Sequence, residues 1–423
     1  MSKILVLCPT QRDYREIAEL NDARAHEFVF HDYATVALEE SIAKEPPSDT
    51  WIGDPEIEIE RVAKRYGPSG IAGVISTDDY PGSTLASIVS HRFRLPGVPV
   101  GADLLCQHKY HGRGAQRQFA PEAVPAFELL DETGSGVMMP FPVFIKPVKS
   151  FFSVGASRVD SAEALPELAR RAELPDRFYQ PFAQLLTRYA GFELGTRRVL
   201  VEAFLKGRQV SLDGYACGGD VHVIGLVDAI MFPDTTSFQR FEYPSRLPES
   251  IQDRMGEVAK KVIQGIGFDN GLFNIEFIYN AAADAVHIVE INPRMSSQFA
   301  DLIEKVDGTN TYSILLDIAL GKKPILQKRE GAHLMAASCV LRVFDNRRVR
   351  KVPDADEIAE LRTRHPDMRV EILAAEGRKL SEAMQDGRSY RYGILNIGGR
   401  DRQDILEIFE ESQRRLTFQF EKA

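Results

Sequence analysis

The feature that most constrains the fold is the alternation of short apolar runs with amphipathic helical patterns along residues 1–105. Apolar runs suited to buried strands lie at 4–7 and 73–76, and apolar residues recur at helical spacing within 55–66 and 83–93. Strands that alternate with helices of this length are joined by crossovers, which makes the sheet parallel. Proline and glycine within 95–100 then end the pattern with one further short strand. An α/β domain is therefore predicted for this part of the chain.

The rest of the chain has a different pattern, in which strands follow one another directly. Two of them, at 209–215 and 221–226, form a predicted hairpin joined by Gly218, Gly219 and Asp220. The other predicted elements are strands at 143–147, 199–205, 272–279, 285–291, 336–344 and 392–397, and helices at 253–266 and 401–416. We expect one domain over 106–328 and a smaller one over 329–423.

Composition excludes several classes of protein. The 423 residues include 52 Lys+Arg and 61 Asp+Glu, which gives a formal charge of −9, and no long basic run suggests a nucleic-acid partner. No apolar stretch reaches about 18 residues, and the apolar run after Met1 is too short for a signal peptide. The four cysteines form no CxxC pair, which argues against a zinc site or a disulfide framework. We therefore expect a soluble cytoplasmic protein with no membrane and no nucleic-acid partner.

Several common motifs are absent from the sequence. It contains no G-x-x-x-x-G-K-[ST] loop, no H-E-x-x-H pair and no G-x-G-x-x-G after the first strand. A nicotinamide-dependent dehydrogenase would need that last fingerprint. The nine histidines show no ligand spacing.

The strongest local signal is a group of oxygen-bearing side chains on two neighbouring predicted strands. Alternation along the second strand places Glu290 and Asn292 on one face, together with Ile288. If the strands form a hairpin, Glu276 can face the same spot, and three hard oxygen ligands would suit Mg²⁺. Arg294 follows, where it could hold phosphate oxygens. The alternative is a set of solvated charges on an edge hairpin, and the residues alone leave both open.

Two further charged residues interrupt apolar strands. Lys146 ends one strand before Pro147, where its ammonium could hold phosphate as a point charge, although the pattern alone is more typical of a surface lysine with a buried stem. Glu202 lies inside another strand and needs a hydrogen-bond donor. Adenine amino or ribose hydroxyl groups could supply that donor, and so could a local backbone group.

Taken in order, these residues resemble the ATP-grasp superfamily of carboxylate–amine ligases. The resemblance rests on Lys109, Phe144-Ile145-Lys146-Pro147, Val201-Glu202-Ala203-Phe204-Leu205, Asn274-Ile275-Glu276-Phe277 and Val289-Glu290-Ile291-Asn292-Pro293-Arg294. No single element is specific, but five in this order are. The tail is similar to the lid of biotin carboxylase and L-amino acid ligases. The resemblance implies an α/β and α+β fold with three parts: a pre-ATP-grasp Rossmann-like domain (1–105), a two-lobed ATP-grasp core (106–328) and a C-terminal lid-like subdomain (329–423).

The resemblance also implies ATP and Mg²⁺ as cofactors, with two metal ions and Mn²⁺ as a substitute. It assigns the nucleotide to Lys109, Lys146, Ser153, Glu202, Ala203, Phe204, Leu205 and Gln209. It assigns the metal ions to Glu276, Glu290 and Asn292, and catalysis to Arg294 and Lys146. A substrate carboxylate would attack the γ-phosphate to give an acyl phosphate, which an amine then captures.

Three departures from the family pattern bear on activity. The phosphate loop at 149–155 keeps one glycine, and its Phe151 and Phe152 are expected to close over the nucleotide as a hydrophobic lid. Ser296 and Ser297 replace a common Gly-Gly pair and, with Asp213, are candidate substrate contacts. Gln209 stands where a glutamate is frequent in the family.

The leading hypothesis is an ADP-forming carboxylate–amine ligase that acts on an amino acid or similar small acid and a small-molecule amine. One alternative is a biotin-carboxylase-like carboxylase. Another is a catalytically inactive nucleotide-binding regulatory protein, although the presence of all three metal-ligand candidates and Arg294 argues against lost activity. A homodimer is common in the family, and the sequence does not decide the oligomeric state.

Overall fold

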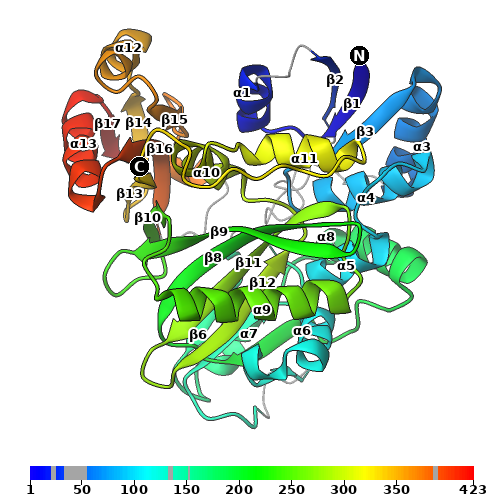
Figure 1. Ribbon diagram of the computed structural model, residues 1–423. Coiled ribbons are helices and arrows are strands. Elements are labelled where there is room, and N and C mark those ends of the chain that lie inside the picture. The colour runs from blue at the N-terminus through cyan, green and yellow to red at the C-terminus, as the bar shows by residue number, and fades with distance from the viewer. Residues whose placement is uncertain (21–24, 33–54, 132–136, 151–152, 384–388) are drawn as a thin grey trace.

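The computed structural model describes residues 1–20, 25–32, 55–131, 137–150, 153–383 and 389–423 (Figure 1). Its N-terminal part is a three-stranded parallel sheet of order β2-β1-β3. The strands are β1 (Ser2–Leu7), β2 (His26–His31) and β3 (Ile71–Ile75), and the helices that follow them in the chain are α1 (Gln11–Glu19), α3 (Pro55–Tyr66) and α4 (Gly82–Phe93). The predicted alternation of strands and helices and the parallel sheet are confirmed.

One predicted element at the end of this part is wrong. The short strand expected within 95–100 does not form, because Val100 is the first residue of helix α5 (Val100–Gln107) and Pro99 is its N-cap. Burial of Leu104 holds this helix against the core, and a short apolar run does not distinguish a strand from the start of a helix. The predicted domain boundary at 105/106 lies inside α5, and both predicted boundaries stay predictions.

The centre of the molecule is an eight-stranded sheet of order β12-β11-β8-β9-β10-β13-β16-β15. Its strands are β8 (Arg208–Cys217), β9 (Asp220–Met231), β10 (Phe238–Tyr243), β11 (Gly271–Asn280), β12 (Ala285–Asn292), β13 (Met335–Val343), β15 (Arg369–Ile372) and β16 (Tyr390–Gly399). The predicted β8–β9 hairpin is confirmed, and Gly218 and Gly219 turn it with φ of 63° and 86°, which glycine adopts without strain. Helix α9 (Glu249–Gly265) covers one face of this sheet (Figure 1).

A second sheet has four strands in the order β4-β7-β5-β6. It consists of β4 (Phe127–Leu129), β5 (Val143–Pro147), β6 (Ser157–Val159) and β7 (Val199–Ala203), with helices α6 (Lys109–Phe119), α7 (Leu165–Ala172) and α8 (Asp176–Leu185) nearby in the chain. Strands β5 and β7 carry Lys146 and Glu202, so this sheet brings two of the singled-out residues together.

Helices α10 (Ala300–Asp307) and α11 (Thr311–Ala319) run between the N-terminal strands and the large sheet (Figure 1). One apolar cluster joins Ile4 and Ile75 of the N-terminal sheet to Ile303 and Ile318 of these helices. The remaining C-terminal elements are α12 (Ala355–Arg364), α13 (Arg402–Arg415) and the two-stranded sheet of β14 (Arg347–Lys351) and β17 (Gln419–Lys422). No helix within the described ranges is both long enough and apolar enough to cross a membrane.

Candidate active site

The site is built around the hairpin of β11 and β12. These strands pair antiparallel, with Glu276 opposite Glu290 and Asn274 opposite Asn292, so the three predicted metal ligands lie on one face of the hairpin, with the Ile275–Ile291 pair between them. Burial and the charge of Glu290 raise the pKa of Glu276 to about 7. Burial opposes ionisation of Glu290 as well, but Lys109 and Lys146 lower the pKa of that carboxyl below its ordinary value. Two neighbouring carboxyl groups therefore have opposite pKa shifts: the pKa of Glu276 is raised and that of Glu290 is lowered.

A bulge at Val289 breaks the predicted alternation along β12. Register shifts between Glu276 and Phe277, so that Phe277 pairs with Ile288 and Val289 is the extra residue. The prediction that Ile288 shares a face with Glu290 is therefore wrong, because Ile288 packs into the apolar core beside Ile291. The bulge also turns the Val289 carbonyl toward the buried side chains of Arg113 and Lys146.

Lys146, Glu202 and Arg113 form a buried charged cluster. The Lys146 Nζ lies 2.8 Å from Glu202 Oε2, and Arg113 Nε lies 2.5 Å from Glu202 Oε1. The Val289 carbonyl accepts from Arg113 Nη2 at 2.7 Å and from Lys146 Nζ at 3.2 Å. Although burial opposes its ionisation, the two cations lower the pKa of Glu202 to about 2. Because only 5% of Lys146 is exposed, the surface-lysine interpretation does not hold.

Arg113 is a site residue that the sequence analysis missed. It lies four residues after Lys109 on α6, a spacing that places the two side chains on one face of a helix. Lys109 itself lies 3.4 Å from Glu290 and donates to the Ser150 carbonyl at 3.2 Å. The four-residue spacing of Lys109 and Arg113 on a helix was therefore the sequence signal from which Arg113 could have been predicted.

The remaining predicted nucleotide contacts lie on β8, at the end of β7 and in the turn after β5. Gln209 donates from Nε2 to Glu276 Oε2 at 2.8 Å, so it contacts a candidate metal ligand. Ala203 ends β7, Phe204 and Leu205 follow it, and all three are half-buried, whereas Ser153 is exposed, with φ of 58°. Phe151 and Phe152, the predicted lid, lie outside the described residues.

A chain of hydrogen bonds runs behind the candidate metal ligands. Asp213 accepts from Asn274 Nδ2 at 2.6 Å, and Asn274 Oδ1 accepts from Asn292 Nδ2 at 3.2 Å. These bonds use the Asn292 NH₂ group and leave its Oδ1 as the atom available to a cation. Asp213 is only 1% exposed, and burial raises its pKa to about 7, so the structure places this predicted substrate contact behind Asn274.

The N-terminal domain contributes a carboxylate that the sequence analysis also missed. Asp79, in the loop after β3, has an oxygen 3.5 Å from Arg294 Nη2 and another 4.0 Å from Lys149 Nζ. Gln107 donates to Asp79 at 2.8 Å and accepts from Lys149. Burial opposes ionisation of Asp79, but Lys149 and Arg294 lower its pKa to about 2. Arg294 thus lies near both a candidate metal ligand, Glu276, and a carboxylate from the N-terminal part of the chain.

The donor set fits Mg²⁺. Within the part of the chain that the structure describes, no group of three or more His, Cys, Asp or Glu side chains suited to a metal occurs, and this site instead offers two carboxylates and one amide oxygen. Hard oxygen donors of this kind, few in number, leave room for the water and phosphate that Mg²⁺ keeps. A cation there would also neutralise the repulsion that raises the pKa of Glu276.

Parts of this chain resemble known proteins in sequence. Residues 139–303 match the family of ATP-grasp domains. The large chain of carbamoyl phosphate synthase from Clostridium acetobutylicum is 22% identical over 224 residues, which is 50% of this chain and 21% of that relative. That of Clostridium perfringens strain SM101 is 29% identical over 127 residues, 30% of this chain and 12% of the relative. The matches thus span about a fifth or less of these relatives' length.

Solved structures resemble the whole chain. L-amino acid ligase from Bacillus licheniformis has a TM-score of 0.75 at 15% identity, covering 100% of this chain and 99% of its own. Biotin carboxylase from Campylobacter jejuni has a TM-score of 0.68 at 14% identity, covering 100% and 93%. At such identities the likeness shows the fold. The resemblance and fold class predicted from the sequence are confirmed: the chain carries an ATP-grasp domain within a mixed α/β fold.

Proposed function

We propose that this protein is an ADP-forming carboxylate–amine ligase that works through an acyl phosphate. The observation that carries the proposal is the convergence of Lys109, Lys146 and Arg294 on the Glu276–Glu290 hairpin. Fixed cations next to oxygen ligands for a divalent metal are what a nucleoside triphosphate requires of its site. The ATP-grasp domain and the ligases among its relatives and structural neighbours support an enzyme of this class.

The residues divide the work as follows. Lys109 and Lys146 bind phosphate oxygens, and Glu276, Glu290 and Asn292 hold Mg²⁺, which supplies charge neutralisation at those oxygens when bound. A substrate carboxylate oxygen attacks the γ-phosphorus, the bond to the β-phosphate oxygen breaks, and ADP leaves. Arg294 stabilises the charge that spreads over the transferring phosphoryl group.

The second half of the reaction needs no protein nucleophile. A neutral amine attacks the acyl carbon, the bond to phosphate breaks, and the amide, inorganic phosphate and one proton are released. An amino acid or similar small acid is the proposed carboxylate substrate, and the L-amino acid ligase fold supports that choice.

A screen of acids crossed with amines tests the proposal. Purified protein with ATP and Mg²⁺ should release phosphate and ADP only with both substrates, and mass spectrometry should detect the amide. Hydroxylamine offered in place of the amine should trap the acyl phosphate as a hydroxamate. Release of AMP and pyrophosphate would contradict the proposal, and turnover with bicarbonate alone would favour a carboxylase.

A further inference from the structure

Arg12, at the start of helix α1, reaches the loop that follows the metal-ligand hairpin. Thr10 caps the helix by accepting from the Asp13 backbone N–H, which places Arg12 in the first turn. The Arg12 Nη1 donates to Ser297 Oγ at 3.0 Å. Ser297 lies three residues after Arg294 and begins a short 3₁₀ turn, Ser297–Phe299.

Glu371 of β15 fixes the Arg12 guanidinium from the other side. Arg12 Nε and Nη2 donate to the two Glu371 oxygens at 2.9 and 2.6 Å, a bidentate pair. Arg15 Nη2 also lies 2.9 Å from Glu371. Since two of its nitrogens are held by a planar carboxylate, the third is aimed at Ser297 with little freedom.

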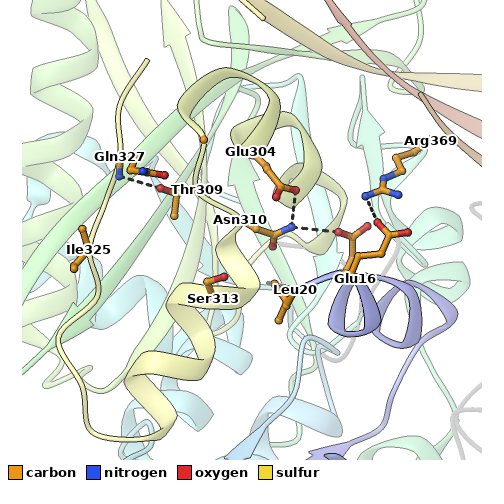
Figure 2. A pocket seen from close by; sticks show the side chains of 11 residues that line it. Glu16, Leu20, Glu304, Thr309, Asn310, Ser313, Ile325, Gln327 and Arg369 are labelled. Atoms are coloured by element: carbon orange, nitrogen blue, oxygen red, sulfur yellow. Dashed lines mark hydrogen bonds and ion pairs between the residues drawn. The ribbon is translucent and has the colours of Figure 1, made fainter. Parts of the chain in front are cut away.

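The same strand holds the far end of the helix. Arg369, two residues before Glu371 and therefore on the same side of β15, pairs with Glu19. Figure 2 shows this end, where Arg369 borders a cavity of about 330 Å³ and Asn310 lies between Glu16 and Glu304. Helix α1 is thus docked on β15 at both ends, which keeps Arg12 in place.

The bond from Arg12 decides what the Ser297 hydroxyl can do. A serine hydroxyl has one donor and two acceptor positions, and a guanidinium has no acceptor. The hydroxyl therefore accepts from Arg12 and must point its proton elsewhere. Among the described residues, no acceptor takes that proton. The proton is left for an oxygen that comes within reach of Ser297, three residues after Arg294.

We infer that Arg12 is a positioning residue that commits the Ser297 hydroxyl to donate to an oxygen of the acid substrate, as carboxylate or as acyl phosphate. The inference rests on the proposed function. It adds Arg12 and Glu371, which lie in other parts of the chain, to the residues that determine how the acid substrate binds. Arg12 acts through Ser297 and does not itself contact the acid.

Steady-state kinetics of four variants test the inference on the full chain, with the acid and amine found in the screen. Ser297→Ala should raise the KM for the acid about tenfold or more, the size of one lost hydrogen bond to a charged group, and leave the KM for ATP unchanged. Ser297→Thr keeps the hydroxyl and should restore the acid KM. Arg12→Met should raise the acid KM like Ser297→Ala, and the double variant should be no worse than either single one.

Matched variants separate positioning from folding. Arg15→Met removes the other arginine on Glu371 and should leave the acid KM unchanged. If Arg12→Met fails to fold, Glu371→Gln loosens the same guanidinium and should raise the acid KM by a smaller factor. Unchanged acid KM in Ser297→Ala, or additive losses in the double variant, would overturn the inference while ligation by the wild type upholds the proposed function. A wild type that makes no ADP with any pair overturns both.

Discussion

Replacement of Glu202 by glutamine should destabilise the protein through the cations that it leaves behind. Arg113 and Lys146 lie within 2.5 and 2.8 Å of this carboxylate and are almost fully buried. The pKa of Glu202 falls from 4.5 to about 2 in the folded chain, which corresponds to about 3 kcal/mol of stabilisation of the charged form. Removing one partner of a buried ion pair costs about 3–5 kcal/mol, which agrees with the value derived from the pKa.

The pH dependence of the loss follows from the sign of the shift. A carboxyl group whose folded pKa is depressed stabilises the fold above its unfolded pKa, and that stabilisation disappears as pH falls through the folded value. The difference between wild type and Glu202→Gln should therefore be complete near pH 7. This difference should fall to less than half of that value near pH 3, which lies between the unfolded pKa of 4.5 and the folded pKa of about 2.

Urea unfolding followed by circular dichroism measures the effect, and hydrogen exchange of peptides from β5 and β7 locates it. Glu257→Gln is the matched control, because Glu257 pairs with Lys260 on the surface and its loss should change the free energy of unfolding by under about 0.5 kcal/mol. If Glu202→Gln unfolds at the wild-type urea concentration at pH 7, the charge argument is refuted.

Three other outcomes are expected. Glu290→Gln should lower kcat about 100-fold while nucleotide binding persists, since a lost carboxylate matters most as phosphate charge redistributes; an unchanged kcat would remove Glu290 from the metal site. Lys146→Met should weaken ATP binding and also lower the urea midpoint, because the ammonium contacts both Glu202 and the Val289 carbonyl; a change in neither quantity would contradict its placement. Mn²⁺ affinity without nucleotide should fall about tenfold per pH unit below pH 7, where Glu276 gains its proton, and calorimetry that finds equal affinity at pH 6 and 8 would contradict this.

Elements with a strong local period were predictable from the sequence. The β11–β12 hairpin, helix α9 and strand β7 were predicted from the spacing of apolar residues over short stretches of the chain. Order along the chain then placed Glu276 and Glu290 together, because a hairpin fixes its own register.

The missing parts of the site depend on contacts that spacing cannot show. Asp79, in the loop after β3, and Arg294, after β12, are far apart in the chain and belong to different sheets. No repeating pattern in the sequence therefore links the two residues. The Val289 bulge adds one residue to an apolar strand that reads as regular, yet it determines which carbonyl faces Arg113. Arg12 likewise follows a strand that lacks a nucleotide fingerprint, and only the docking of α1 on β15 brings it to Ser297.

The continuity of the large sheet limits how the protein can be divided. Strand β13 of the tail pairs directly with β10, and Arg402 of α13 lies 3.1 Å from the buried Glu242 of β10. A fragment that stops near residue 328 would leave the β10 edge without its partner strand, and open edges recruit other chains. Such a fragment should aggregate rather than behave as an independent nucleotide-binding unit. Exchange of tails between related enzymes would have to preserve the β10–β13 strand pairing, so the tail and the core are expected to change together during evolution.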